Sequence, residues 1–457
     1  MHSRIKEYVE TNRDRFLSEL FDLIRIPSVS AQPAHTEDVL RAAEYVRARL
    51  EELGAETEIL PTEGFPLVYG KLEVNASAPT VVVYGHYDVQ PAEPFELWTT
   101  PPFEPTIRNG KIYARGANDD KGQMYMQIKA VETLVRLGAL PCNVKFLIEG
   151  EEEIGSASLD AAIKKYADRY AGDVMLISDT SMIHLDAPSL CVSLRGLTYM
   201  EVELTGPCRD LHSGHFGGAV ENPCNVLCSL IASLRDENYR VTIPGFYDDV
   251  YELTVEERAK LAERPFDRTE YLRKLDMADT RGESGYTILE QASIRPTLDV
   301  NGIWGGYTGE GSKTVLPSKA SAKISMRLVP HQRHDDIAEK FKRHFETIAP
   351  PSMKVKVTTH HGGNPFMTPT DSTGYQAAAA ALKECLGKDP IPTREGGSIP
   401  ILALFDEVLK MPIVLMGFGY DTDGIHGPNE HYGLDNFFRG IESIAVFYHK
   451  FAELSKS

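Results

Sequence analysis

Apolar positions in the first part of the chain predict alternating helices and strands. Near-helical spacing of apolar residues predicts a helix over 3–26, ended by Pro27, and a second helix over about 37–53, ended by Gly54. Short apolar runs then alternate with helical segments to about residue 180. This alternation predicts an α/β fold, in which a mostly parallel sheet is covered by helices on both faces.

The pattern changes near residue 190. The next segments follow the order βαββαβ, which predicts a ferredoxin-like α+β unit. They are strand 197–205, helix 222–235, a strand near residue 300, strand 320–329, helix 334–348 and strand 353–359. Asn222 followed by Pro223 suits the start of the first of these helices. Residues 236 to about 298 fit neither pattern, and we interpret them as an insertion whose shape the sequence does not predict.

The α/β pattern resumes after residue 365. The expected elements are a helix over about 372–386, a helix after Ser398, a strand over 412–418 and a long helix from about 433. A length of 457 residues also exceeds one core and suggests two or three domains at about 100–200 residues each. We therefore predict a discontinuous domain, residues 1–189 and 365–457, with a second domain, residues 190–364, inserted into it.

Side chains that bind metals stand just after apolar runs of the first domain. They occur in VVVYGHYDVQP, YARGANDDKG, VKFLIEGEEEIGS, VMLISDT and IVLMGFGYDTDGIHGPNE, as His86, Asp88, Asp119, Glu152, Glu153, Asp179 and His426. Ligands of an open α/β sheet bind outside the carboxyl ends of its strands, so these side chains should converge on one crevice. A lone His or Asp is usually a solvated or hydrogen-bonded residue, but this joint placement favours a site.

These residue types predict a metal centre. Imidazole and carboxylate groups suit zinc or manganese, and the absence of cysteine from this set of residues argues against a purely structural zinc site. The candidate ligands would crowd one ion, so we expect two, about 3.5–4 Å apart, with a shared carboxylate. Two such ions acidify a water molecule, and a carboxylate that is not a ligand must take its proton.

Charge and composition restrict the other functions that are open to the chain. Its 48 basic and 66 acidic residues give a net charge of -18, which opposes nonspecific binding to nucleic acid or anionic membranes. No apolar run approaches the roughly 18 residues of a membrane span, and the N-terminal segment lacks the apolar core of a signal peptide. The six cysteines are dispersed, as in a protein with free thiols, so we expect a cytoplasmic protein.

Eight ordered motifs resemble the dinuclear metallopeptidase superfamily that includes aminoacylases, glutamate-cleaving zinc carboxypeptidases and succinyl-diaminopimelate desuccinylase. The motifs are GHYDVQP, GANDDKG, EEIGS, RDLHSG, KTVLP, SMRLVP, HGGNP and REGGSIP. Within the superfamily, the chain is similar to the carnosinase and cytosolic nonspecific dipeptidase branch over nearly its whole length. The resemblance implies that the discontinuous domain is catalytic and that the inserted domain serves dimerisation and covers the site.

The resemblance also implies a role for each candidate ligand. His86 and Asp179 would hold one metal ion, Glu153 and His426 would hold the other, and Asp119 would bridge them. The peptide bond between Asp119 and Asp120 is expected to be cis in this family. Two zinc or manganese ions per subunit would follow.

Catalytic and substrate-binding roles are carried over in the same way. Glu152 would be the general base, Asp88 would orient the imidazole of His86, and His212 would polarise the scissile carbonyl from the partner subunit of a homodimer. Arg327 would hold the carboxylate of the substrate, for which a guanidinium fork is well suited. The further expected substrate contacts are Thr314, His361 and Ser398.

These roles predict metal-dependent hydrolysis of dipeptides with a free amino terminus. Asp179 favours this activity, because the acylase and carboxypeptidase branches usually have Glu at its position. An N-acyl amino acid hydrolase is the alternative, since the same metals cleave any secondary amide. A noncatalytic binding protein on the same fold is a less favoured alternative. Such a chain should lack some of the ligands or the base, and here none is missing.

Overall fold

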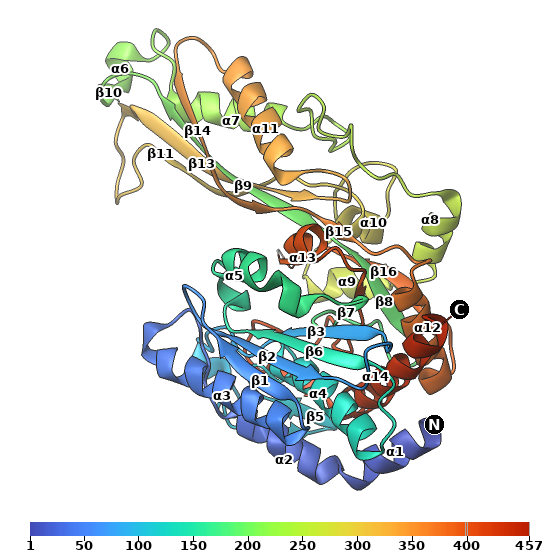
Figure 1. Ribbon diagram of the computed structural model, residues 1–457. Coiled ribbons are helices and arrows are strands. Elements are labelled where there is room, and N and C mark those ends of the chain that lie inside the picture. The colour runs from blue at the N-terminus through green and yellow to red at the C-terminus, as the bar shows by residue number, and fades with distance from the viewer. Residues whose placement is uncertain (398, 400, 457) are drawn as a thin grey trace.

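Two sheets organise the chain into a large and a small lobe, as Figure 1 shows. The computed structural model describes residues 1–397, 399 and 401–456. Within these residues, no helix is both long and apolar enough to span a membrane.

The sheet of the large lobe is parallel at its centre. Its order is β1-β2-β6-β3-β7-β17-β8-β15, and β16 pairs with β8. The strands are β1 (Glu56–Leu60), β2 (Leu67–Leu72), β3 (Thr80–His86), β6 (Asn143–Glu149), β7 (Val174–Ile177), β8 (Ser189–Leu194), β15 (Phe366–Met367), β16 (Ile391–Glu395) and β17 (Ile413–Leu415). The run β6-β3-β7-β17 is parallel, whereas β1, β2 and β15 add antiparallel edges. The predicted α/β class is confirmed.

Helices cover both faces of this sheet. One face carries α1 (His2–Thr11), α2 (Arg13–Ile24), α3 (Thr36–Glu52), α4 (Lys121–Arg136), α12 (Thr373–Leu386) and α14 (Leu434–Leu454), and the other carries α5 (Leu159–Tyr166) and α13 (Ile401–Leu409). Successive residues of β3 point to opposite faces of the sheet. Val83 packs in the hydrophobic core on the side of α4 and α14, and Tyr84 packs in the core on the side of α5 and α13. The sheet is therefore buried on both sides, as a parallel centre requires.

The first predicted helix is two helices. Asn12 interrupts it with φ -106° and ψ 10°, and its Nδ2 donates a hydrogen bond to the carbonyl of Tyr8 at 2.8 Å. Asn side chains compete with the helix for backbone hydrogen bonds, which apolar periodicity does not reveal.

The small lobe has the predicted βαββαβ order. It consists of β9 (Gly196–Thr205), α7 (Pro223–Ser233), β11 (Asp299–Gly305), β13 (Lys319–Leu328), α11 (His334–Ile348) and β14 (Lys354–Gly363). The sheet order is β11-β13-β9-β14, and all its pairs are antiparallel. Asn222 begins α7 by accepting a hydrogen bond from the amide of Cys224 at 2.9 Å, which confirms the predicted start.

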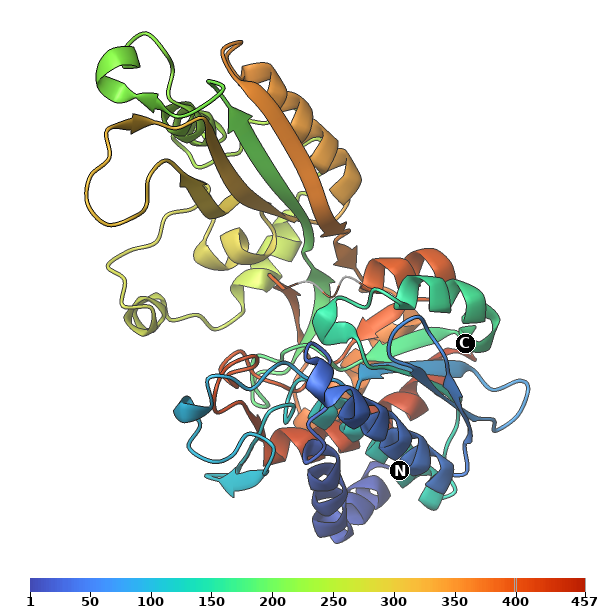
Figure 2. The same ribbon diagram turned by 90° about the vertical axis from the view of Figure 1, so that its left-hand side faces the viewer.

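The insertion forms three short helices around a charged core. The helices are α8 (Val255–Ala262), α9 (Arg268–Lys274) and α10 (Ile288–Ser293). The Arg295 side chain beside them is buried, and its Nε and Nη2 donate to the Glu283 carboxylate at 2.9 and 2.8 Å. In Figure 2 the insertion, in yellow-green, lies between the small sheet and the large lobe. Because a buried ion pair organises it, apolar periodicity could not predict its shape.

Two short sheets complete the fold. β4 (Thr106–Arg108), β5 (Lys111–Tyr113) and β18 (His431–Gly433) form one of them, and β10 (Leu211–His212) and β12 (Val315–Leu316) form the other, beside α6 (Ser213–Phe216). The chain passes between the lobes at Arg195, since β8 ends one residue before it and β9 begins one residue after. The division into residues 1–189 with 365–457 and residues 190–364 stays a proposal, and β8 places its first crossing a few residues later.

Candidate metal centre

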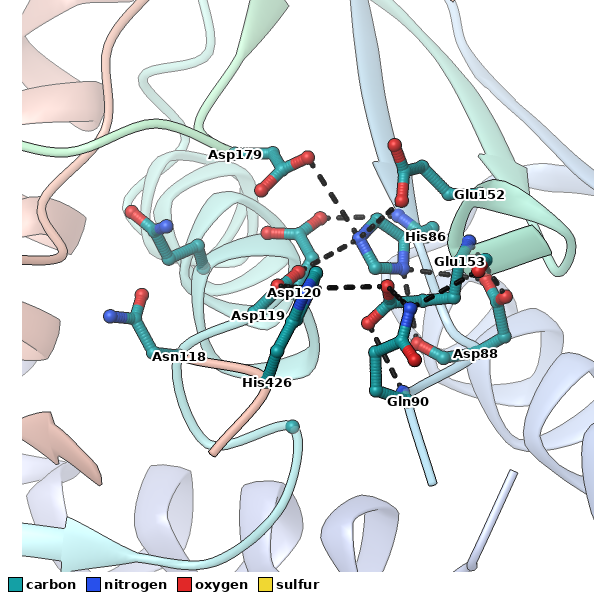
Figure 3. A network of polar contacts seen from close by, with 12 residues as sticks. His86, Asp88, Gln90, Asn118, Asp119, Asp120, Glu152, Glu153, Asp179 and His426 are labelled. Atoms are coloured by element: carbon teal, nitrogen blue, oxygen red, sulfur yellow. Dashed lines mark hydrogen bonds and ion pairs between the residues drawn. The ribbon is translucent and has the colours of Figure 1, made fainter. Parts of the chain in front are cut away.

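Three parallel strands bring four of the candidate residues to one edge of the large sheet, as drawn in Figure 3. His86 is the last residue of β3, and Asp179 stands two residues after β7. Glu152 and Glu153 begin the 3-10 turn that follows β6. Because β6, β3 and β7 are parallel neighbours, their carboxyl ends meet at this edge.

Asp119 and His426 reach the same place by other routes. Asp119 lies just before α4, and the peptide bond to Asp120 is cis, as expected. The strand before it, β5, belongs to the short three-stranded sheet, so the expectation that Asp119 follows a strand of the main sheet is wrong. His426 lies in the loop between β17 and β18 with a φ of 61°.

The two carboxylate oxygens of Asp119 face two different imidazoles. Oδ1 lies 3.2 Å from His86 Nε2, and Oδ2 lies 2.9 Å from His426 Nε2. Asp179 Oδ2 stands 3.8 Å from the same His86 nitrogen, and Glu153 Oε2 stands 3.2 Å from that of His426. Two groups of three ligand atoms result, each with its atoms within 4.8 Å of one another, and Asp119 belongs to both.

Glu152 lies beside these groups and belongs to neither. Its Oε2 is 4.0 Å from His86 Nε2. Burial raises the pKa of Glu152 above its usual value; the imidazole of His86 partly offsets this rise, and the negative charges of Asp179 and Asp119 add to it. Glu152 is therefore a buried carboxylate next to two potential cation sites.

The cluster holds more negative charge than its imidazoles balance. Burial, together with the charge of Asp119, raises the pKa of Asp179 to about 7. Burial alone would also raise the pKa of Asp119, but His426 and His86 hold it below its usual value. Hydrogen bonds to Asp119 and Glu153 raise the pKa of His426 to about 10. Bound divalent cations would relieve the repulsion between these buried carboxylates.

A second observation supports the fit of metal ions. The Nε2 atom of His86 is buried and makes no well-formed hydrogen bond with any described residue. Its Nδ1 lies 3.0 Å from the backbone carbonyl of Asp88 and 3.3 Å from the carboxylate Oδ1 of the same residue. Contacts at Nδ1 leave Nε2 to face the cluster, which is the arrangement of a metal-binding imidazole. The residues present therefore fit divalent cations.

Asp88 also links the two halves of the cluster. Its Oδ2 accepts a hydrogen bond from Ser30 Oγ at 2.7 Å and from the backbone amide of Glu153 at 3.2 Å. The residue thus contacts both the His86 imidazole and the turn that carries Glu153.

Sequence reasoning missed two supporting residues, Gln90 and Glu430. The Gln90 amide and Nε2 donate to the two carboxylate oxygens of Glu153 at 3.1 and 2.8 Å. The carboxylate of Glu430 is fully buried and accepts hydrogen bonds from the backbone amides of Asn118 and Asp119 at 3.0 and 3.1 Å. Its other oxygen accepts from Arg115 Nη1 at 2.6 Å. The only signal for Glu430 was its closeness in sequence to His426.

We call the candidate ligands His86, Asp119, Glu153, Asp179 and His426, together with Glu152, the metal cluster. It borders a cavity of about 220 Å³. Glu152, Asp179 and His426 line one part of it, and Glu395 and Gly397 after β16 line another. Ser398, an expected substrate contact in this loop, lies outside the described residues.

The other expected substrate contacts lie on the small lobe. Arg327 is on β13, and His361 on β14 stacks its ring on Tyr199 with 5.1 Å between ring centroids. His212 pairs with Val315, and the amide of the next residue donates to the carbonyl of Thr314 at 3.1 Å. β10 and α6 lie at the far end of the small lobe in Figure 1, so one chain does not bring His212 and Thr314 to the metal cluster.

Comparison with known proteins establishes the class. The profile of peptidase family M20/M25/M40 matches residues 82–450, and the chain belongs to this family. The sequence is 33% identical to Cys-Gly metallodipeptidase dug1 of Schizosaccharomyces pombe, with 99% of this chain and 98% of the relative covered.

Solved structures with the same fold include two relatives of similar identity. Human carnosine dipeptidase 1 superposes with a TM-score of 0.82 at 32% identity over 99% of both chains. The M20 family metallo-carboxypeptidase Sso-CP2 from Sulfolobus solfataricus superposes with a TM-score of 0.84 at 34% identity, with 96% of this chain and 99% of that chain covered.

Replacing Asp119 tests whether it is shared between two ions. We expect Asp119→Ala, and the isosteric Asp119→Asn, to lose both metal equivalents, because Asp119 faces both imidazoles. Metal content per chain, measured by inductively coupled plasma mass spectrometry after dialysis, checks this. Asp186→Ala, whose side chain is 91% exposed, is the control and should keep the wild-type content. Two retained equivalents in folded Asp119→Asn would contradict the shared position.

Proposed function

We propose that this protein is a dinuclear metal-dependent dipeptidase that cleaves dipeptides with a free amino terminus. The observation that carries the proposal is the carboxylate of Asp119 between two ligand groups, with Glu152 beside both and part of neither. Relatives at about the same identity are named Cys-Gly metallodipeptidase in Schizosaccharomyces pombe and Beta-Ala-His dipeptidase in Homo sapiens.

The two ligand groups would each hold one ion. His86 and Asp179 would bind the first, Glu153 and His426 the second, and Asp119 both. Zinc and manganese are the metals that these nitrogen and oxygen ligands suit. Divalent cations bound here supply electrophilic stabilisation of the scissile carbonyl and acidify a water molecule.

Glu152 would then act as the general base. Its carboxylate takes the proton of the attacking water and delivers it to the leaving amide nitrogen. Burial raises the pKa of Glu152, and a raised pKa makes its carboxylate a stronger proton acceptor. Asp88 would keep the His86 imidazole oriented through its Nδ1 atom.

Residues of the small lobe would hold the substrate. Arg327 would bind its C-terminal carboxylate through a two-pronged contact, with Thr314, His361 and Ser398 as further contacts. His212 would stabilise the oxyanion that forms on the scissile carbonyl.

We also propose a homodimer in which His212 acts on the site of the partner subunit. Support comes from the distance of β10 from the metal cluster within one chain. The outer edge of β11 is unpaired within the described residues and exposes Val300, Ile303 and Trp304. An exposed apolar edge strand is a typical site for pairing with a second chain.

The alternative activity is hydrolysis of N-acyl amino acids, which needs the same metals and base. Asp179, rather than Glu, favours the dipeptidase. A noncatalytic binding protein is disfavoured because no ligand position is empty and Glu152 lies beside the ligands. The cytoplasmic location expected from the sequence stays a prediction.

Glu152→Gln separates the base from the ligands. We expect the variant to keep both metal equivalents and to lose about 10²–10⁴-fold in kcat, because only proton transfer is removed. Steady-state kinetics with Ala-Gly, together with metal analysis, check this. Glu151→Gln is the neighbouring control, since Glu151 contacts the Phe65 and Ser158 amides outside the cluster. A metal-free Glu152→Gln protein would mean that Glu152 is a ligand.

The amino terminus of the substrate separates the dipeptidase from the acylase. We expect free dipeptides to be cleaved much faster than the same compounds in N-acetylated form. Arg327→Ala should raise KM and lower kcat together, because binding of the carboxylate also positions the scissile bond. Faster turnover of N-acetyl amino acids than of any dipeptide would refute the dipeptidase and favour the alternative.

Mixed dimers test the action of His212 across the interface. Glu152→Ala and His212→Ala subunits are each nearly inactive, but a heterodimer has one site with both residues intact. Random exchange at equal amounts makes half of the dimers mixed with half of their sites intact, so we expect roughly a quarter of wild-type activity. Purified heterodimers with no gain over the parents would show that His212 does not act in trans.

A further inference from the structure

A second cavity, of about 530 Å³, lies between the small sheet and the insertion. Guanidinium groups dominate its charged lining, which comprises Arg195, Arg235, Arg281, Arg295 and Arg327, against the two carboxylates of Glu283 and Asp299. In a protein with a net charge of -18, such a local excess of positive charge is unusual. We call this hollow the arginine cavity.

Two of these arginines lack a carboxylate partner. The acids of the cavity are already engaged, since Glu283 binds Arg295 at 2.8 Å and Asp299 binds Arg235 at 3.1 Å. Arg195 and Arg281 form no ion pair with any carboxylate of the described residues.

The hydrogen bonds of their side chains are with neutral oxygens. Arg195 Nε donates to the carbonyl of Gly396 at 3.1 Å, and its buried Nη1 has no partner in the described part of the chain. Arg281 Nη2 makes one long contact of 3.5 Å with the carbonyl of Glu237. Arg281 is exposed, whereas the buried Nη1 of Arg195 lacks an acceptor. A buried donor without an acceptor is costly, so an anionic group that binds Arg195 would be stabilised.

Tyr239 contacts two of the guanidinium groups that line the arginine cavity. The guanidinium carbon of Arg281 lies 4.3 Å from the centroid of the Tyr239 ring, and that of Arg235 lies 5.6 Å from it. Burial and the nearby charge of Arg327 lower the pKa of Arg195 to about 10, so it stays charged at neutral pH. A cationic site that is already ordered binds an anion with a smaller entropic cost.

Shared lining residues connect the arginine cavity, through a third hollow, to the cavity beside the candidate metal ligands. A hollow of about 870 Å³ lies between them and shares Arg195 and Tyr271 with the arginine cavity. The same hollow shares Glu395, Gly397 and Ile425 with the cavity that borders the metal ligands. Shared lining residues thus lead from the candidate metal ligands to Arg195, and Arg195, Arg281 and Arg327 line the arginine cavity together.

We infer that the arginine cavity receives the side-chain carboxylate of an acidic C-terminal residue, so that dipeptides ending in Asp or Glu are the preferred substrate class. The inference rests on the proposed function, in which Arg327 binds the α-carboxylate. Arg195 and Arg281 then bind the second carboxylate. A neutral side chain of the same shape leaves these donors unpaired and gains less.

Ala-Glu and Ala-Gln are a matched pair of substrates for this test, since they differ only in the side-chain charge. We expect kcat/KM for Ala-Glu to exceed that for Ala-Gln by about tenfold, as a charge-assisted hydrogen bond implies. Arg281→Gln should abolish most of this preference, so that the two kcat/KM values become similar. Arg273→Gln is the matched control, because Arg273 lies on α9 of the same insertion and pairs with Glu270 outside the cavity.

Binding gives a readout that does not depend on turnover. Calorimetric titration of metal-loaded Glu152→Gln protein should show the same preference for Ala-Glu, and the double variant with Arg281→Gln should lose it. If the two peptides were hydrolysed and bound equally well, the preference for acidic residues would be refuted and the proposed function would stand. If the metal-loaded wild type hydrolysed neither peptide, the proposed function itself would be refuted. Citrate serves as a free anion in a further test. If citrate changed the turnover of Ala-Gln by the wild type but not by Arg281→Gln, and Ala-Glu were not preferred, the cavity would bind a free anion and the inference would be overturned.

Discussion

The carboxylate of Asp119 between His86 and His426 is the contact on which the geometry of the site depends. The two imidazoles come from segments 340 positions apart in the numbering, one at the end of β3 and one in the loop before β18. Glu430 stabilises this arrangement. Its buried carboxylate accepts hydrogen bonds from the backbone amides of Asn118 and Asp119, and its own segment carries His426. One acid thus joins the loop that supplies the shared ligand to the loop that supplies the last imidazole.

Buried charge also organises the region that faces this site. Arg295 and Glu283 form the core of the insertion, and ion pairs tie the insertion to the large lobe through Arg264 with Asp421 and Arg394 with Glu257. Breaking the buried pair of Arg295 and Glu283 would be costly. The two pairs with the large lobe are partly exposed and connect the insertion to it. The insertion lines a hollow that adjoins the candidate metal ligands, and its helices α8 and α10 contact β16.

Regular parts of the fold and most of the metal cluster could be predicted because they depend on local patterns. Apolar runs marked β3, β6 and β7, and polar residues directly after them met at one edge since parallel strands share their direction. The βαββαβ order of the small lobe followed from periodicity in the same way. The break at Asn12 and the charged core around Arg295 could not be predicted, because neither changes the spacing of apolar residues.

The sequence by itself determined the α/β class, the inserted α+β unit, the metal-binding residue types and the family to which the chain belongs, because these follow from patterns within short segments. Only the tertiary structure decided which ligands face each other, how Gln90 and Glu430 hold them, and where the arginines of the insertion gather. It also placed His212 and Thr314 far from the cluster of their own chain. These features depend on contacts between distant segments, whose distances no local pattern encodes.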